Sequence, residues 1–273
     1  MPGRAGTIVF CHDNGFTAGI YGVLFRAWRA AGWRVLAPEK LGHDPAHPVS
    51  SGWPQLREEL LAYIAAEAGA APVALVGHSM GGYLSLLAAS RAPAAVSAVV
   101  LLDAPIVAGW RAHTFHMLKV SGLIRRGGPG RVSQRRRTHW PSAAALREHF
   151  ESKRAFALWD RRVFDDYLRH GFETDAAGGK SLAFQREIET RIYNTLPHHV
   201  QQLLRRHPLR CPVAWVGGTR SVENRQLGLG FVRRLAGTRW AALDGTHLFP
   251  MEKPEETAAA VLRLLSAAPA PRP

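Results

Sequence analysis

Short apolar runs alternate with longer amphipathic segments over the first hundred residues of the chain. The apolar runs have the length and the β-branched content of buried strands, and they cover residues 7–11, 33–37, 72–76 and 98–102. Between them, residues 21–31 and 56–68 have helical patterns, and in the second segment Leu60, Leu61 and Ile64 share one face. Strands that alternate with helices predict an α/β fold, a mainly parallel, doubly wound sheet with helices on both faces.

The alternation stops after Asp103 and resumes about a hundred residues later. Residues 105–208 are polar, basic and mostly helical in pattern, and strands return at residues 213–216 and 240–243. We therefore predict a core of about six strands formed by residues 1–104 and 209–273. A helical segment, residues 105–208, is inserted into this core after the strand that ends at Asp103.

Composition is consistent with a single globular unit. The chain has 273 residues, and 47% of them are hydrophobic, enough for a sizeable core. Cys11 and Cys211 lie beside predicted strands, so we expect two small buried side chains rather than a disulfide or a metal site. No apolar stretch approaches the ~18 residues of a membrane span, and the N-terminus does not resemble a secretory signal, which predicts a cytoplasmic protein.

The positive charge is concentrated in the inserted segment. The formal net charge is +14, and residues 106–210 contain 20 Lys and Arg against 9 Asp and Glu. The segment contains one pair and one triplet of arginines, Arg125-Arg126 and Arg135-Arg136-Arg137. These clusters are compatible with an anionic substrate, a carrier-bound acyl thioester or an anionic membrane surface. A solvated basic face without a partner is the alternative. No nucleic-acid-binding motif is present, so we expect no nucleic-acid partner.

The segment Gly77-His78-Ser79-Met80-Gly81 fits the pattern G-x-S-x-G. It lies between the predicted strand 72–76 and a helix-forming segment, residues 83–89. A serine between glycines at a strand-to-helix turn is typical of a nucleophile elbow, in which the hydroxyl stands above the sheet near a helix N-terminus. We therefore predict that Ser79 is a nucleophile.

Histidine and carboxylate side chains follow other strands of the predicted sheet. His247 comes after the last strand, and Asp103 comes directly after the strand 98–102. Because the carboxyl ends of parallel strands meet at one edge of a sheet, we expect both side chains near Ser79. A serine hydroxyl needs an adjacent base, and imidazole has a suitable pKa range, so His247 is the candidate base.

Three motifs together resemble those of the α/β-hydrolase superfamily: residues 12–16, residues 77–82 and residues 245–247. The first motif usually reads H-G-x, and here Asp13 replaces the glycine. The resemblance implies a Ser-His-acid triad. It places the acid in the loop after the penultimate strand, residues 217–224, yet positions 219–221 contain no carboxylate. Asp103 is therefore the favoured acid, and Glu223 is the alternative.

The resemblance also implies an oxyanion hole and a function. The backbone N–H groups of Asn14 and Met80 are the expected oxyanion donors, and residues 105–208 stand where relatives have a cap or lid. We expect a serine hydrolase that cleaves an acyl bond of a small molecule, a carboxylic ester above all, without cofactor or metal. An acyl-thioesterase, a C–C bond hydrolase and a non-catalytic binding protein of the same fold are the alternatives. The sequence leaves the oligomeric state open.

Overall fold

The structure, a computed structural model, describes residues 6–125 and 128–267. Its main sheet has six strands in the order β2-β1-β3-β4-β8-β9, and every neighbouring pair is parallel. The prediction of a mainly parallel sheet of about six strands is confirmed. The strands are β1 (Thr7–Cys11), β2 (Arg34–Leu36), β3 (Val73–His78), β4 (Val96–Leu102), β8 (Val213–Gly218) and β9 (Trp240–Leu243).

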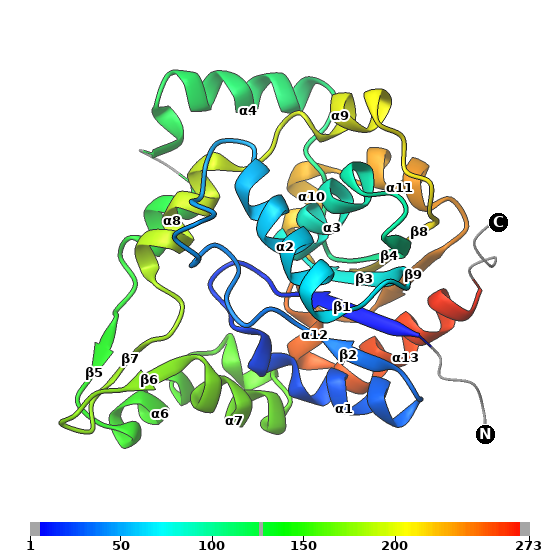
Figure 1. Ribbon diagram of the computed structural model, residues 1–273. Helices are drawn as coiled ribbons and strands as arrows, with labels where there is room; N and C mark the ends of the chain where they lie inside the picture. Colours follow the sequence, from blue (N-terminus) through cyan, green and yellow to red (C-terminus); the bar gives the residue numbers. More distant parts are fainter. Residues whose placement is uncertain (1–5, 126–127, 268–273) are drawn as a thin grey trace.

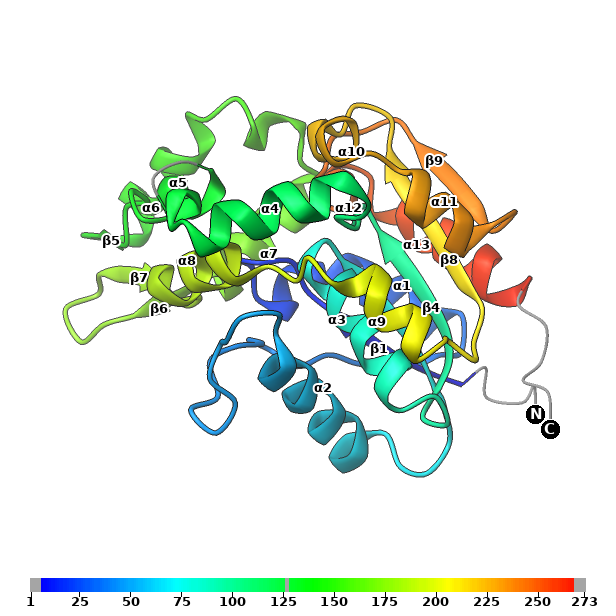
Figure 2. The ribbon, with the colours of Figure 1, turned by 90° about the horizontal axis from the view of Figure 1, so that it is seen from above.

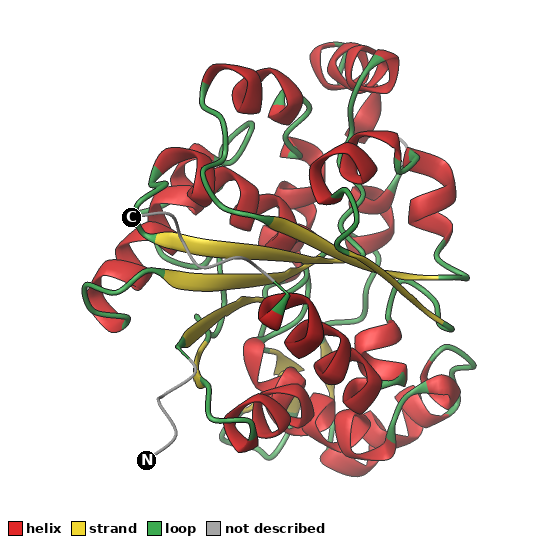
Figure 3. Ribbon diagram, turned by 90° about the vertical axis from the view of Figure 1, so that its right-hand side faces the viewer, coloured by secondary structure: helices red, strands yellow, loops and turns green. Residues whose placement is uncertain are grey.

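Helices cover both faces of this sheet (Figure 3). Alternation along β1 shows the two faces: Ile8 and Phe10 pack into one apolar core, and Val9 and Cys11 pack into the other. The first core is closed by α1 (Gly22–Ala30) and α13 (Pro254–Ser266), and the second by α2 (Pro54–Glu67), α3 (Met80–Arg91) and α11 (Gly230–Ala236). Each large apolar side chain buried in this way contributes about 1.5–3 kcal/mol.

Most of the segment between β4 and β8 forms a layer over the carboxyl ends of the strands, whereas its last helix, α9 (Val200–Arg206), lies beside α3 and packs into the second apolar core (Figures 1 and 2). The segment also contains a three-stranded antiparallel sheet, in the order β5-β7-β6, which the sequence did not predict because strands of two or three residues leave no periodicity. The division of the chain into a core and a cap stays a prediction. The elements are α4 (Trp110–Val120), α5 (Pro129–Ser133), β5 (His139–Trp140), α6 (Ala143–Glu151), α7 (Arg161–His170), β6 (Phe172–Thr174), β7 (Lys180–Leu182), α8 (Arg186–Thr195) and α9 (Val200–Arg206).

Two further short helices are α10 (Val222–Leu227), which follows β8, and α12 (Phe249–Glu252), which follows β9. Cys11 is buried, Cys211 is half-buried, and both are free thiols. Among the described residues, no helix is both long and apolar enough to cross a bilayer.

Arg135 and Arg137 of the arginine triplet are exposed, whereas Arg136 between them is half-buried. Arg136 is only 27% exposed, and its guanidinium pairs with the Glu189 carboxylate of α8 at 2.6 Å. Arg126 lies outside the described residues. At least one member of the triplet is therefore paired with a carboxylate and is not a free surface charge.

Candidate active site

The turn between β3 and α3 holds Ser79 in a strained backbone conformation, with φ 50° and ψ −110°. The Ser79 N–H donates to the Leu102 carbonyl at 2.9 Å, and within the described residues the Ser79 side chain does not cap α3. A Cβ at Gly81 would overlap the Cys11 carbonyl, and one at Gly77 would overlap the Gly81 carbonyl. Only glycine therefore fits on either side, and the turn leaves the Ser79 hydroxyl available for chemistry.

Asp103 follows β4 and is fully buried, with φ 42°. Its carboxylate accepts hydrogen bonds from four donors, and these offset the cost of burying a charge on a strained backbone. Its Oδ1 accepts from Gly218 N–H at 2.8 Å and from Asn224 Nδ2 at 2.7 Å. Its Oδ2 accepts from Ser221 Oγ at 2.6 Å and from His247 Nδ1 at 2.7 Å.

His247 is held from two sides. Its Nδ1 bonds to Asp103, and its backbone carbonyl accepts a hydrogen bond from His78 Nε2 at 3.0 Å. Burial opposes a positive charge on the ring, but the hydrogen bond to Asp103 and the charges of Asp13, Asp103 and Glu223 outweigh it and raise the pKa of His247 to about 9. The imidazole therefore carries a proton at neutral pH.

Glu223, the alternative acid, lies farther from the histidine. Its carboxylate oxygen is 3.9 Å from His247 Nδ1, a nitrogen that already donates to Asp103, and its side chain is 44% exposed. Two neighbours in the same loop, Ser221 and Asn224, bond instead to Asp103. The sequence did not predict these two donors, because a hydroxyl and an amide in a loop give no local signal of a distant carboxylate.

His78 takes part in a hydrogen-bonded chain rather than in proton transfer. Its Nε2 faces the His247 carbonyl and must donate, so its Nδ1 accepts from the Tyr21 hydroxyl at 2.8 Å. That hydroxyl in turn accepts the Asp13 N–H at 3.2 Å. Burial lowers the pKa of His78, which favours this neutral form.

The same contacts limit what this cluster can bind. His78, Asp13 and His247 come close enough together to suggest a metal site, as do Asp103, Glu223 and His247. Both nitrogens of His78 are engaged, and Nδ1 of His247 donates to Asp103. Neither group therefore offers a complete set of free lone pairs, and the donor chemistry fits proton transfer better than metal binding.

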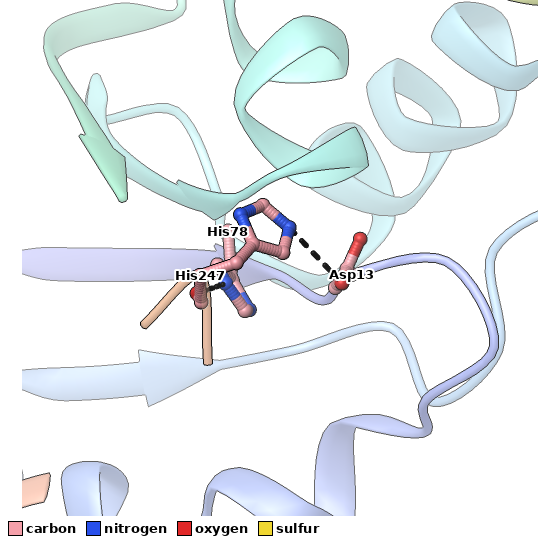
Figure 4. Close-up of side chains that lie close together, drawn as sticks. All are labelled: Asp13, His78 and His247. Atoms are coloured by element: carbon pink, nitrogen blue, oxygen red, sulfur yellow. Dashed lines mark hydrogen bonds and ion pairs between the residues drawn. The ribbon is translucent and has the colours of Figure 1, made fainter. Parts of the chain in front are cut away.

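The expected oxyanion donors differ in availability. Among the described residues, no acceptor is hydrogen-bonded to the Met80 N–H, at the first turn of α3. The Asn14 N–H already donates to Oδ1 of Asp13 at 2.6 Å. The other oxygen of Asp13 lies 3.7 Å from His247 Nε2. Figure 4 shows these two side chains facing each other. The replacement of glycine by Asp13 therefore places a carboxylate beside His247, in the centre of the site.

Helix α8 packs against the loop after β1, which contains Asn14 and Gly15. The Asn14 side-chain amide donates to the Glu189 carbonyl at 3.0 Å, and a Cβ at Gly15 would meet the Glu189 and Arg136 side chains at 2.9 and 3.0 Å. The loop after β1 and the segment between β4 and β8 are therefore in direct contact.

Comparison with known proteins agrees with the fold. Residues 8–260 match the model of the alpha/beta hydrolase family. No curated protein sequence matches the chain. Similar solved structures include the thioesterase domain from the curacin biosynthetic pathway, with a TM-score of 0.71 and 19% identity over 98% of this chain and 92% of that one.

Two further similar structures are hydrolases that act on different chemical groups according to their names. E-2-(acetamidomethylene)succinate hydrolase has a TM-score of 0.75 and 19% identity over 96% of this chain and 92% of its own. Epoxide hydrolase A from Mycobacterium thermoresistibile has a TM-score of 0.68 and 18% identity over 99% and 93%. At such low identity these structures show a shared fold alone, whereas the family model covers nearly the whole sequence. The chain therefore belongs to the alpha/beta hydrolase family.

Proposed function

We propose that the protein is a serine hydrolase that cleaves an acyl bond, a carboxylic ester being the simplest substrate. The observation that carries the proposal is the buried Asp103 carboxylate, which bonds to His247 Nδ1 at 2.7 Å beside the elbow that presents Ser79. A carboxylate in this position orients the imidazole and stabilises its protonated form. Family membership supports hydrolase activity, and the elbow serine favours an acyl-enzyme route.

The reaction has two halves. Ser79 Oγ attacks the carbonyl carbon while His247 Nε2 takes the hydroxyl proton, and the oxyanion is held by the N–H of Met80 and, once Asp13 has turned away, by that of Asn14. The C–O bond to the alcohol breaks, and the alcohol leaves with the proton from His247. Water then repeats the sequence on the acyl-enzyme and releases the acid and Ser79.

Specificity within this chemistry is assigned to the layer formed by residues 105–208, because α8 contacts the loop that contains Asn14. The same apparatus acts on thioesters and, in related chemistry, on C–C bonds, so a substrate panel decides among them. A location in the cytoplasm stays a prediction.

The pH profile provides a first prediction. Because His247 acts as a base only when neutral, its pKa of about 9 places most of the enzyme in the inactive, protonated form at pH 7. We expect kcat/KM on a neutral ester to rise about tenfold per pH unit below this value and to level off above it. Measurement of initial rates between pH 6 and 10 tests this. A profile that levels off near pH 6.5 would contradict the proposed environment of His247.

Labelling with a fluorophosphonate tests the nucleophile without knowledge of the substrate. At pH 9 we expect one covalent adduct by intact-mass spectrometry on the wild type and none on Ser79→Ala. Circular dichroism of both proteins is the control for folding. Absence of an adduct on folded wild type would overturn the hydrolase proposal and favour the non-catalytic binding protein.

A further inference from the structure

Asp13 contacts both groups that an acyl substrate would need. Its Oδ1 accepts the Asn14 N–H at 2.6 Å, and its Oδ2 lies 3.7 Å from His247 Nε2 (Figure 4). The Asp13 side chain is only 7% exposed, so water screens its charge poorly. An oxyanion at the Asn14 N–H would occupy the place of Oδ1, and the two anions would repel each other.

The surroundings of His247, the residue that Asp13 faces, are acidic although the protein as a whole is basic. Asp103 and Glu223 also lie within 4 Å of His247, so three carboxylates surround one imidazole. In the part of the chain that the structure describes, the only cationic group paired with Asp13 is His247, because Arg136 pairs with Glu189. His247 must be neutral to accept the Ser79 proton, so in the enzyme–substrate complex, before that proton is transferred, Asp13 lacks a cationic partner.

A substrate can replace that partner. A positive charge on the substrate would pair with the Asp13 carboxylate, draw it away from the Asn14 N–H and offset its repulsion of the oxyanion. We place this positive charge on the leaving alcohol rather than on the acyl group. The leaving group is protonated by His247 Nε2, and Asp13 faces the same nitrogen.

We propose that Asp13 determines specificity, and that the site selects acyl esters whose leaving group carries an ammonium or quaternary ammonium close to the scissile bond. The inference rests on the proposed function and names its substrate class. It also reverses the expectation from overall charge, since the basic clusters of residues 105–208 would favour an anionic substrate.

A pair of substrates of the same shape isolates the charge. Acetylthiocholine and S-(3,3-dimethylbutyl) thioacetate differ only in a quaternary nitrogen that is replaced by carbon, and both release a thiol that is measured directly. At pH 9 we expect kcat/KM for the cationic thioester to exceed that for the neutral one by at least about tenfold in the wild type. Equal values would overturn the inference while leaving the proposed function intact.

Asp13→Asn keeps the side-chain shape and an acceptor for the Asn14 N–H, and removes the charge. We expect the ratio of kcat/KM for the cationic thioester to kcat/KM for the neutral one to fall to about one. Any general damage to the site would instead lower both values together and leave the ratio unchanged. Asp244→Asn is the matched control, because Asp244 is 63% exposed and pairs with Arg220 outside the site. This control should retain the full preference.

Protection from labelling gives a readout that needs no turnover. Choline should slow fluorophosphonate labelling of Ser79 at lower concentration than 3,3-dimethylbutan-1-ol does, and Asp13→Asn should abolish the difference. Equal protection by the two alcohols in the wild type would overturn the inference even if neither thioester is a substrate. Loss of labelling itself would instead refute the proposed function.

Discussion

Ser79→Ala is expected to lower kcat by at least about 10⁴-fold while the fold is retained. Without Oγ no acyl-enzyme forms, and only transition-state stabilisation by the backbone donors and substrate binding remain. Alanine removes one oxygen that caps no helix within the described residues, so stability should change little. Steady-state hydrolysis of the neutral thioester at pH 9, together with thermal unfolding, measures both effects.

Ser90→Ala is the matched control for this variant. Ser90 belongs to the same helix, α3, is 7% exposed, and donates to the His207 carbonyl at 2.8 Å, away from the elbow. The same chemical change there should leave kcat within a few-fold of the wild type. More than about one hundredth of wild-type activity in Ser79→Ala would exclude this serine as the nucleophile.

Asp103→Asn is expected to have the second largest effect, a loss of about 10⁴-fold in kcat. The amide has one acceptor oxygen in place of two, so it cannot serve Ser221, Asn224 and His247 together, and the wrong tautomer of His247 is favoured. Loss of the buried negative charge also lowers the pKa of His247. The profile of the residual activity should therefore shift to lower pH, which steady-state rates between pH 6 and 10 measure.

Glu223→Gln makes the same carboxylate-to-amide change on the alternative acid, which follows β8. Because Glu223 is 3.9 Å from His247 Nδ1 and 44% exposed, we expect kcat to stay within a few-fold of the wild type. Near-normal activity in Asp103→Asn combined with a crippled Glu223→Gln would reverse the assignment of the acid. Together the two variants separate the alternatives that the sequence left open.

The sheet and the elbow were predictable because they depend on near neighbours in the chain. The strand at Thr7–Cys11 and the last strand at Trp240–Leu243 have the predicted bounds, and the Gly77–Gly81 pattern marks the turn before α3. Apolar runs and glycines act through local backbone preference and burial, which a sequence pattern records directly. The small sheet β5-β7-β6 escaped because its strands are too short to show a period.

The acid network could not be predicted in the same way. Ser221 and Asn224 bond to Asp103 across more than a hundred residues, and a hydroxyl or an amide in a loop carries no sign of such a partner. The family resemblance predicted an acid in this loop, residues 217–224, but positions 219–221 contain no carboxylate. The contribution of the loop is instead a set of donors for a carboxylate that another strand supplies.

By itself, the sequence determined the alternating core, the strained serine turn and the chain order of Ser79, Asp103 and His247 after their strands. The tertiary structure alone decided which carboxylate meets the His247 ring and that Asp13 reaches both the Asn14 N–H and His247 Nε2. The physical reason is range. Periodicity and turn chemistry act over a few residues, whereas the pairing of charges depends on distances of a few ångströms between segments that only the folded chain brings together.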